Sequence, residues 1–242
     1  MDNVLTDVEM LTLEKYRFKK QLKTSIKSTD LLNQDFMAEF LIKLMDSIGA
    51  PTMKVAASIF MKRYAFLAVI SLYSMTAWNK KLNVAITNIE MEAARSDEQW
   101  LPAFAFKDFS VQSCQEENRI NWREEVFQEL FANHLSLLIR QLREVTNISE
   151  VVLWENIAVY LFWLYESELK DHPNAINDFR FLFTKANGAL FGEYSENPLQ
   201  KYMGEKTFVD ELQEEVRIRK TCCFSYQLKV NGHRCKVCPC RH

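Results

Sequence analysis

Cysteines gather near the end of the chain at spacings that suit metal binding. Cys222 and Cys223 are adjacent, and eleven residues separate them from the C-x2-C pair of Cys235 and Cys238. Four thiolates from two short segments can hold a zinc ion or an iron–sulfur cluster. Adjacent residues of an extended chain point in opposite directions, so Cys222 and Cys223 are poorly placed to chelate one ion. The spacing therefore favours a [2Fe–2S] cluster, which has two metal centres, and leaves zinc or a disulfide as alternatives.

Positive charge surrounds these cysteines. From Arg217 to the end of the chain there is no acidic residue, and the basic residues are Arg217, Arg219, Lys220, Lys229, Arg234, Lys236 and Arg241. The whole chain has 30 basic and 32 acidic residues, so the remainder is acidic. Four thiolates around zinc or a [2Fe–2S] cluster leave a net negative charge, which nearby cations stabilise. The charge pattern therefore supports a metal centre of either kind.

The cysteine motif resembles that of a known family. Arg219-Lys220-Thr221-Cys222-Cys223-Phe224-Ser225-Tyr226, followed by Cys235-Lys236-Val237-Cys238-Pro239, is similar to the C-terminal signature of the FhuF-like ferric siderophore reductases. The usual gap between the pairs in that family is ten residues, and a turn around Asn231-Gly232 accommodates the extra residue here. Leu153-Trp154-Glu155-Asn156 and Asn197-Pro198-Leu199 resemble further segments of the family.

The resemblance implies a cytosolic oxidoreductase that reduces an imported ferric siderophore by one electron and releases ferrous iron. The siderophore would be of the hydroxamate or citrate-hydroxamate type. The resemblance also implies a [2Fe–2S] cluster held by Cys222, Cys223, Cys235 and Cys238, with Cys240 outside the ligand set. Electrons would come from a ferredoxin-like donor. Such donors are acidic, so we expect the basic residues near the cysteines to form its docking site.

Positive side chains are the expected contacts for an anionic ferric complex. The candidates are Arg180, Lys185, Arg217, Arg219, Lys220, Arg234 and Lys236. Arg180 and Lys185 lie beside aromatic residues on a predicted helix, where a solvated helix face is the alternative interpretation. We expect no catalytic side chain beyond the cluster, because one-electron transfer to iron needs no nucleophile or general base. His134 and Cys114 are interpreted as structural residues.

The residues alone leave a non-catalytic function open, in which zinc or a cluster stabilises a regulatory or partner-binding protein. Other classes are disfavoured. Only 5 of the 242 residues are glycine, and neither G-x-G-x-x-G nor G-x-x-x-x-G-K-[ST] occurs, so the common nucleotide-binding loops are excluded. The balanced charge argues against nucleic-acid binding.

The N-terminal region predicts a cytoplasmic protein. Residues 1–20 carry Asp2, Asp7, Glu9 and Glu14 and lack the basic and apolar regions of an export signal. The longest uncharged apolar stretch, residues 64–78, is shorter than a bilayer span. We therefore expect no integral membrane segment, and in a reducing compartment we expect no structural disulfide.

Apolar periodicity predicts a mostly α-helical protein with a small antiparallel β-sheet, which is an α+β fold. Helices are expected over residues 29–48, 52–78, 121–145, 151–164, 173–185 and 207–220, with a short helix starting at Asn197-Pro198. Strands are expected over 82–91 and 104–111. A capping box formed by Asn147 and Glu150 should open the helix at 151. Residues 1–216, with the sheet at about 82–112, are expected to form a siderophore-binding body, and residues 217–242 a short cysteine-rich cluster segment.

Overall fold

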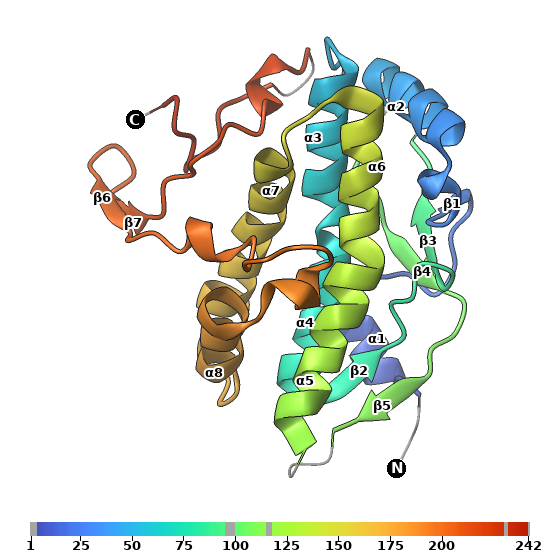
Figure 1. Cartoon of the computed structure of the whole chain (residues 1–242), viewed down its shortest axis with the longest axis vertical. Helices are drawn as coiled ribbons and strands as arrows, with labels where there is room; N and C mark the ends of the chain where they lie inside the picture. The colour runs from blue at the N-terminus through green and yellow to red at the C-terminus, as the bar shows by residue number, and fades with distance from the viewer. Residues whose placement is uncertain (1–3, 95–99, 115–117, 230–231, 242) are drawn as a thin grey trace.

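The structure is a computed structural model that describes residues 4–94, 100–114, 118–229 and 232–241. Its centre is the helix pair α3 (Met53–Tyr64) and α4 (Phe66–Trp78), which meet at Ala65. Around α3 lie α2 (Gln34–Ile48), α6 (Ser136–Thr146) and α7 (Glu150–Trp163), as Figure 1 shows. The predicted mostly helical α+β fold is confirmed.

The α3–α4 pair is the core of the protein because it is apolar on all sides. Thr52 begins it, since its side chain accepts a hydrogen bond from the backbone N–H of Val55. Residues 53–78 have a mean hydropathy of 1.6 over their most apolar window, and by length and composition they could cross a bilayer. In this fold 89% of that window is buried inside the protein. The helix pair therefore fills the role of a buried core helix.

The stretch expected to be helical over 121–145 is continuous from α5 (Arg119–Phe127) through a π-helical segment (Gln128–Leu135) into α6. His134 lies in the π-helical segment and is fully buried. Its Nδ1 lies 2.7 Å from the carbonyl oxygen of Val84, and its Nε2 lies 2.7 Å from the hydroxyl of Tyr64. These contacts satisfy both ring nitrogens, which agrees with the predicted structural role.

The capping box predicted at Asn147 and Glu150 is wrong. Asn147 ends α6 in the left-handed conformation, with a φ of 53°. Ser149 caps α7 instead, because its side chain accepts a hydrogen bond from the backbone N–H of Val151. Asparagine and serine are both common at helix boundaries. Only the geometry of the turn shows that Asn147 ends one helix and Ser149 begins the next.

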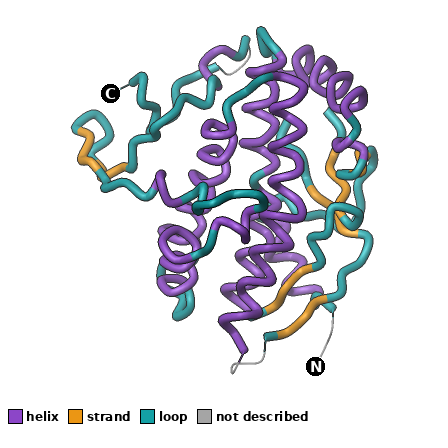
Figure 2. Tube along the Cα trace, viewed as in Figure 1, coloured by secondary structure: helices purple, strands orange, loops and turns teal. Residues whose placement is uncertain are grey.

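Small antiparallel sheets pack beside the helices (Figure 2). One contains β1 (Ser25–Lys27), β3 (Ile89–Glu92) and β4 (Phe104–Phe106), and a second pairs β2 (Lys80–Leu82) with β5 (Val111–Ser113). The single strand expected over 82–91 is therefore wrong. Asn88 interrupts it, because its side-chain amide donates to the carbonyl oxygens of Asn83 and Asp108 at 2.7 and 3.0 Å. Asparagine side chains that bond nearby backbone favour turns over strands.

Shorter helices complete the body. α1 (Asp7–Glu14) begins with a capping box of Thr6 and Glu9. The helix expected over 173–185 is α8 (Ala175–Arg180) followed by a π-helical segment (Phe181–Lys185). The short helix expected at Asn197-Pro198 is a 3-10 turn over Gln200–Tyr202.

The helix expected over 207–220 is wrong, since this region forms the hairpin of β6 (Thr207–Val209) and β7 (Glu214–Val216). The pairing places Val209 and Val216 on the same face, where both are buried. These two residues are seven apart, and a helix would also place them on one face. The apolar spacing alone therefore does not distinguish the two structures. Gln213 makes the turn with a φ of 52°.

Candidate metal centre

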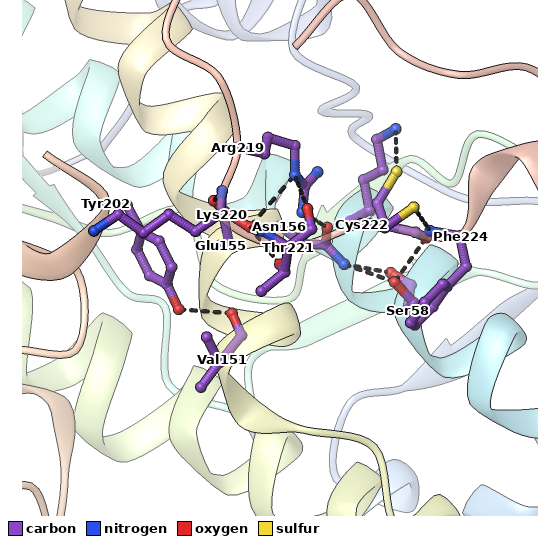
Figure 3. A network of polar contacts seen from close by, with 12 residues as sticks. Ser58, Val151, Glu155, Asn156, Tyr202, Arg219, Lys220, Thr221, Cys222 and Phe224 are labelled. Carbon is purple, nitrogen blue, oxygen red and sulfur yellow. Dashed lines mark hydrogen bonds and ion pairs between the residues drawn. The ribbon is translucent and has the colours of Figure 1, made fainter. Parts of the chain in front are cut away.

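The chain before the cysteines is held by a carboxylate on α7. Glu155 is 2% exposed, and its Oε1 accepts the backbone N–H of Lys220 at 2.6 Å. Its Oε2 accepts the backbone N–H of Thr221 at 2.7 Å and also the hydroxyl of Thr221. Figure 3 shows this carboxylate facing the two residues. Residues 220–221 are therefore fixed in place directly before Cys222.

Arg219 supplies the positive charge that balances this buried carboxylate. The side chain of Arg219 is 2% exposed, and its Nε lies 3.6 Å from Oε2 of Glu155. Its Nη2 donates to Oδ1 of Asn156 at 2.6 Å, and its Nε donates to the carbonyl of Thr221 at 3.1 Å (Figure 3). A buried ion pair is tolerated only with such additional hydrogen bonds. Arg219 is thus committed to the interior of the protein.

Helices α3 and α7 together hold the first cysteine pair. The side-chain amide of Asn156 donates to the carbonyl oxygen and the hydroxyl of Ser58 at 2.9 and 3.0 Å. The hydroxyl of Ser58 in turn donates to the carbonyl oxygen of Cys223 at 2.9 Å. Because Asn156 also accepts from Arg219, one amide connects both helices to the segment that carries the cysteines.

Hydrogen-bond donors surround the sulfur atoms of this pair. Phe224 adopts the left-handed conformation with a φ of 61°, and its backbone N–H donates to Sγ of Cys222 at 3.3 Å. Nζ of Lys62 lies 3.6 Å from Sγ of Cys223, and the hydroxyl of Ser225 lies 3.0 Å from the same sulfur. Donors and cations at this range stabilise negatively charged sulfur.

The second cysteine pair folds back onto the first. The side chains of Cys223 and Cys235 are hydrogen-bonded. The sulfur atoms of Cys222, Cys238 and Cys240 all lie within 4.8 Å of one another. The sulfur group thus contains two of the predicted ligands, Cys222 and Cys238, together with Cys240, which the sequence placed outside the set, while Cys223 and Cys235 contact each other. Cys114 follows β5 in another part of the molecule, where its backbone N–H donates to the carbonyl of Asn79 at 2.9 Å.

The loop between the pairs is anchored to the body. The backbone N–H of Lys229 donates to the carbonyl of Gly49 at 3.0 Å, at the end of α2. Gly232 approaches Leu228 so closely that an added Cβ would lie 2.1 Å from the Leu228 carbonyl oxygen. Only glycine fits that position. Asn231, expected in the same turn, lies outside the described residues.

The thiols differ in acidity because their surroundings differ. The hydrogen bond with Cys235 lowers the pKa of Cys223, and the charges of Lys62 and Arg219 act in the same direction. The same hydrogen bond raises the pKa of Cys235. Burial raises the pKa of Cys222. A thiolate at Cys223 is therefore favoured, and thiolate is the form that binds metals.

The predicted cationic residues divide into two groups. Arg217 is occupied internally: its Nη2 lies 2.9 Å from Oε1 of Glu166, and its guanidinium lies 4.1 Å from the centre of the Phe162 ring. Lys236 pairs with Glu214 at 2.8 Å on the surface. Arg217, Lys236 and the buried Arg219 therefore all have acidic partners within the protein.

The other cationic residues are exposed. Lys220 and Arg234 flank the cysteines, and Arg234 donates to the side chains of Cys238 and Cys240 while it lies 4.4 Å from the centre of the Tyr226 ring. Arg180 and Lys185 are also exposed, on α8 and the turn that follows it. Figure 1 shows α8 at the lower left and the C-terminal segment at the upper left, separated along the long axis of the molecule.

Several site residues were not predicted as such from the sequence. Ser58 and Lys62 lie on the core helix pair, with no local sign that they face the cysteines. Glu155 and Asn156 carried a signal, because they are the polar pair inside the apolar stretch of α7. A buried carboxylate and amide in such a stretch need polar partners.

A pocket of about 590 Å³ lies at the start of α7. Its lining includes Glu150, Val151, Trp154, Tyr194, Asn197, Pro198 and Lys201. Trp154 directly precedes Glu155, so the pocket and the cysteine centre are formed on consecutive residues of one helix. Asn197 shapes the wall, because its side-chain amide donates to the carbonyl of Leu182 at 2.7 Å.

The donor set defines a class of protein. Thiolate sulfur is a soft ligand, and a group of cysteines with nearby cations and N–H donors suits zinc or an iron–sulfur cluster. The fold and the site thus describe an α+β protein with a group of C-terminal cysteines that could bind a metal.

The comparison with known families identifies that class more closely. The model of the family described as "Ferric iron reductase FhuF-like transporter" matches residues 58–226, which is most of the chain, so the protein belongs to this family. The match begins at Ser58 and includes Lys62, Glu155, Asn156 and the Cys222–Cys223 pair. No curated protein and no solved structure matches the chain.

Proposed function

We propose that the protein reduces the iron of a ferric siderophore by one electron, with a [2Fe–2S] cluster bound by Cys222, Cys223, Cys235 and Cys238. One observation carries the proposal. The segment with the first cysteine pair is held against α3 and α7 by Ser58, Glu155 and Asn156, which lie inside the region that matches the ferric iron reductase family.

The chemistry needs little from the protein besides position and charge. A bound [2Fe–2S] cluster stores and supplies one electron. Ferric iron takes up that electron and becomes ferrous iron, and no bond to the protein forms. Hard oxygen ligands bind the less highly charged ion more weakly, so the siderophore then releases it.

The residues of the chain favour electron uptake at this site. Lys62, Ser225 and the backbone N–H of Phe224 lie against cysteine sulfur atoms. Donors and cations beside the sulfur ligands raise the reduction potential of such centres. Arg219 contributes less, because Glu155 balances its charge.

The proposed substrate is a ferric complex of the hydroxamate or citrate-hydroxamate type, in the cytosol. Residues 1–216 would bind it and residues 217–242 would carry the cluster. The exposed charges of Lys220 and Arg234 beside the cysteines support an anionic complex or an acidic, ferredoxin-like donor at this surface. A separate donor is needed because the sequence has no common flavin or nicotinamide loop.

A second function has one observation in its favour. The sulfur atoms of Cys222, Cys238 and Cys240 lie close enough together to bind a single ion. Three or four thiolates suit zinc, which would make the segment a structural module of a non-catalytic, regulatory or partner-binding protein.

The experiment that separates these functions starts with metal content and colour. The protein is purified without oxygen, and its iron, zinc and acid-labile sulfide are measured beside its visible spectrum. The proposal requires iron and sulfide in equal amounts and a red-brown colour. It further requires that the protein, supplied with electrons, forms ferrous iron from ferric siderophores, detected with a ferrous trap. A colourless zinc protein would overturn it.

Serine substitutions then test the ligand set. Cys222→Ser, Cys223→Ser, Cys235→Ser and Cys238→Ser should each abolish or strongly change the visible spectrum. Cys240→Ser is the matched control, because its sulfur lies beside those of Cys222 and Cys238. If Cys240→Ser lost the cluster and Cys238→Ser retained it, the predicted ligand set would be wrong.

A further inference from the structure

Two arginines near the cysteines, one buried and one half-buried, have no acidic partner among the residues that the structure describes. Arg63 follows Lys62 on α3 and is only 8% exposed. Within the described part of the chain, its buried Nη1 atom has no hydrogen-bond partner, and the same is true of Nη1 of Arg17. Neither arginine forms an ion pair with any residue that the structure describes. Elsewhere in the protein buried guanidinium groups are paired, as Arg123 is with Asp178 at 3.1 Å.

Aromatic rings form the walls around these guanidinium groups. The guanidinium carbon of Arg17 lies 3.7 Å from the centre of the Phe66 ring, and that of Arg63 lies 5.7 Å from the Trp100 ring. The Phe66 ring also packs on Tyr160 at 4.7 Å and near Trp163 at 6.2 Å. Trp163 is 37% exposed and Arg17 is half-buried, so the group reaches the surface.

The two positive charges are close enough to repel each other. Burial and, next to it, the charge of Arg17 lower the pKa of Arg63 to about 10, while Tyr160 opposes the change. Burial also lowers the pKa of Arg17, again opposed by Tyr160. Both groups remain charged at neutral pH. Contact with aromatic rings offsets part of the free-energy cost of removing a guanidinium group from water, but an acidic partner offsets more of it.

This arginine pair packs on the same helices that hold the first cysteine pair, since Arg63 is on α3 and Arg17 contacts Phe66 at the start of α4. Helices α3 and α7 run in the same direction, because Ser58 meets Asn156 and, further along both, Phe66 meets Tyr160. Lys62, which contacts Cys223, is one turn before Phe66. One helical turn is about 5.4 Å, so the pair lies one to two turns from the cysteine centre.

We propose that Arg17, Arg63 and Tyr160 bind a carboxylate group of the ferric chelate. This inference rests on the proposed function and narrows its substrate to chelates that carry a free carboxylate, such as citrate-based hydroxamates. Guanidinium groups donate two parallel hydrogen bonds to a carboxylate, and Nη1 of each arginine is buried with no hydrogen-bond partner among the described residues. The phenol of Tyr160 adds a third donor, and the rings contact the hydrocarbon part of the chelate.

Binding is tested with a carboxylate that does not compete strongly for iron. Tricarballylate is titrated into the full-length, metal-loaded protein at constant ionic strength, and tryptophan fluorescence and the melting temperature are recorded. The wild type should bind and melt at a higher temperature, whereas sodium chloride at equal ionic strength should have no such effect. Absence of tricarballylate binding to the wild type would overturn the site.

Substitutions place the binding at these residues. Arg17→Gln should weaken tricarballylate binding at least tenfold, and Tyr160→Phe several-fold. Lys43→Gln is the control, because it removes an exposed positive charge on α2 and should leave binding unchanged. Arg63→Met should also abolish binding and, without any carboxylate, should melt at a higher temperature than the wild type, because it removes a buried charge without an acidic partner. If Arg63→Met does not fold, Arg17→Gln and Tyr160→Phe decide the question, and unchanged binding in both would overturn the site.

A reductase assay distinguishes failure of the site from failure of the proposed function. The wild type and Arg17→Gln are compared on the ferric complex of a citrate-based dihydroxamate and on that of a neutral trihydroxamate. Arg17→Gln should raise KM about tenfold for the first complex and leave that for the second unchanged. Equal effects on both complexes would overturn carboxylate recognition. Tricarballylate binding at these residues in a protein that reduces neither complex would uphold the carboxylate site and refute the reductase.

Discussion

Two arginines of this protein are similarly buried and have opposite surroundings. The side chain of Arg219 is enclosed by Glu155, Asn156 and the backbone of its own segment, and every contact is polar. Arg63, five residues after Ser58 on α3, faces Trp100 and the second cation Arg17. The difference teaches that burial by itself does not define a role. A buried charge with its partners in place holds structure, and one without an acidic partner is available to a ligand.

His134 is a third buried basic group, and the protein treats it differently again. Burial lowers its pKa to about 4, so it is neutral at physiological pH. Its two ring nitrogens contact Val84 and Tyr64. Histidine can thus lose its charge when no anion is near. An arginine cannot do so near neutral pH, which is why the unpaired Arg63 is the informative case.

The largest effect is expected when the partner of Arg219 is removed. Glu155→Gln leaves the guanidinium buried without an anion and turns an amide donor toward the N–H groups of Lys220 and Thr221. Breaking a buried pair in this way costs about 3–5 kcal/mol of unfolding free energy. Denaturant unfolding should show that loss, and the visible spectrum should show that the cluster is lost or unstable.

Glu166→Gln is the matched control for that variant. Glu166 pairs with Arg217 and Lys206 at 2.9 Å, but its side chain is 24% exposed and that of Lys206 is 39% exposed. Burial acts to raise the pKa of Glu166, and the hydrogen bonds of its two partners outweigh that effect and lower it. We expect a loss of about 1 kcal/mol or less and an intact spectrum. If both variants lost the same unfolding free energy, the buried and the exposed ion pair would not differ in their contribution to stability.

The neutral state of His134 predicts a pH dependence of stability. Its pKa is about 4 in the folded protein against 6.5 in the unfolded chain, so the unfolded state binds the proton first as the pH falls. Its contribution is therefore complete above pH 6.5 and declines from there down to pH 4, by up to about 1.4 kcal/mol per pH unit. Urea unfolding of the wild type and His134→Gln across this range measures it. If both proteins lost stability with the same slope, His134 would not be the group that titrates.

Lys62 tests whether a half-buried cation beside cysteine sulfur adjusts the metal centre. Lys62→Met removes the charge 3.6 Å from Sγ of Cys223 and keeps a side chain of similar length. The reduced form, which is more negative, should lose stability relative to the oxidised form. We expect the midpoint potential to fall by up to about 60 mV, a tenfold change for one electron. Lys54→Met, on an exposed position of the same helix, should leave the potential unchanged.

The smallest effects should come from the exposed cations. Arg234 and Lys220 flank the cysteines, whereas Lys185 lies beyond α8. Raising the ionic strength from about 0.01 M to about 0.15 M shortens the Debye length from about 30 Å to about 8 Å. The rate at low substrate should fall several-fold for an anionic ferric complex. Arg234→Glu should reduce the same rate more than Lys185→Glu does, and a larger effect of Lys185→Glu would move the binding surface to α8.

The sequence predicted much of this molecule because its signals were local. The helices of the core followed from apolar spacing, and Gly49 ended α2 as expected, with a φ of 62°. The family followed from the residues around Cys222 and Cys235. The hairpin at 207–216 was mispredicted because Val209 and Val216 have a spacing that fits both a helix and a hairpin.

The contacts of the site could not be predicted, because they join residues far apart in the chain. Ser58 and Cys223 are 165 positions apart, and no local pattern relates them. The number of basic residues in the tail also did not show how many of them are available to bind a ligand or a partner. Arg217 and Arg219 belong to that basic run, and both turn out to have internal acidic partners. Position in the sequence therefore did not show which of these charges reach solvent.

The anchoring of the cysteine segment has a consequence for how the protein is made. Ser58, Lys62, Glu155 and Asn156 all precede residue 219, so synthesis from the N-terminus completes the receiving surface first. Chains are extended at about 5–20 residues per second, and earlier parts fold while later parts are still being added. The thiols therefore emerge onto a surface that already exists. Under the proposed function, metal loading is then a late step of biogenesis, separate from folding of the helices, and a chain without metal can keep Cys223 docked against Lys62 and Ser58.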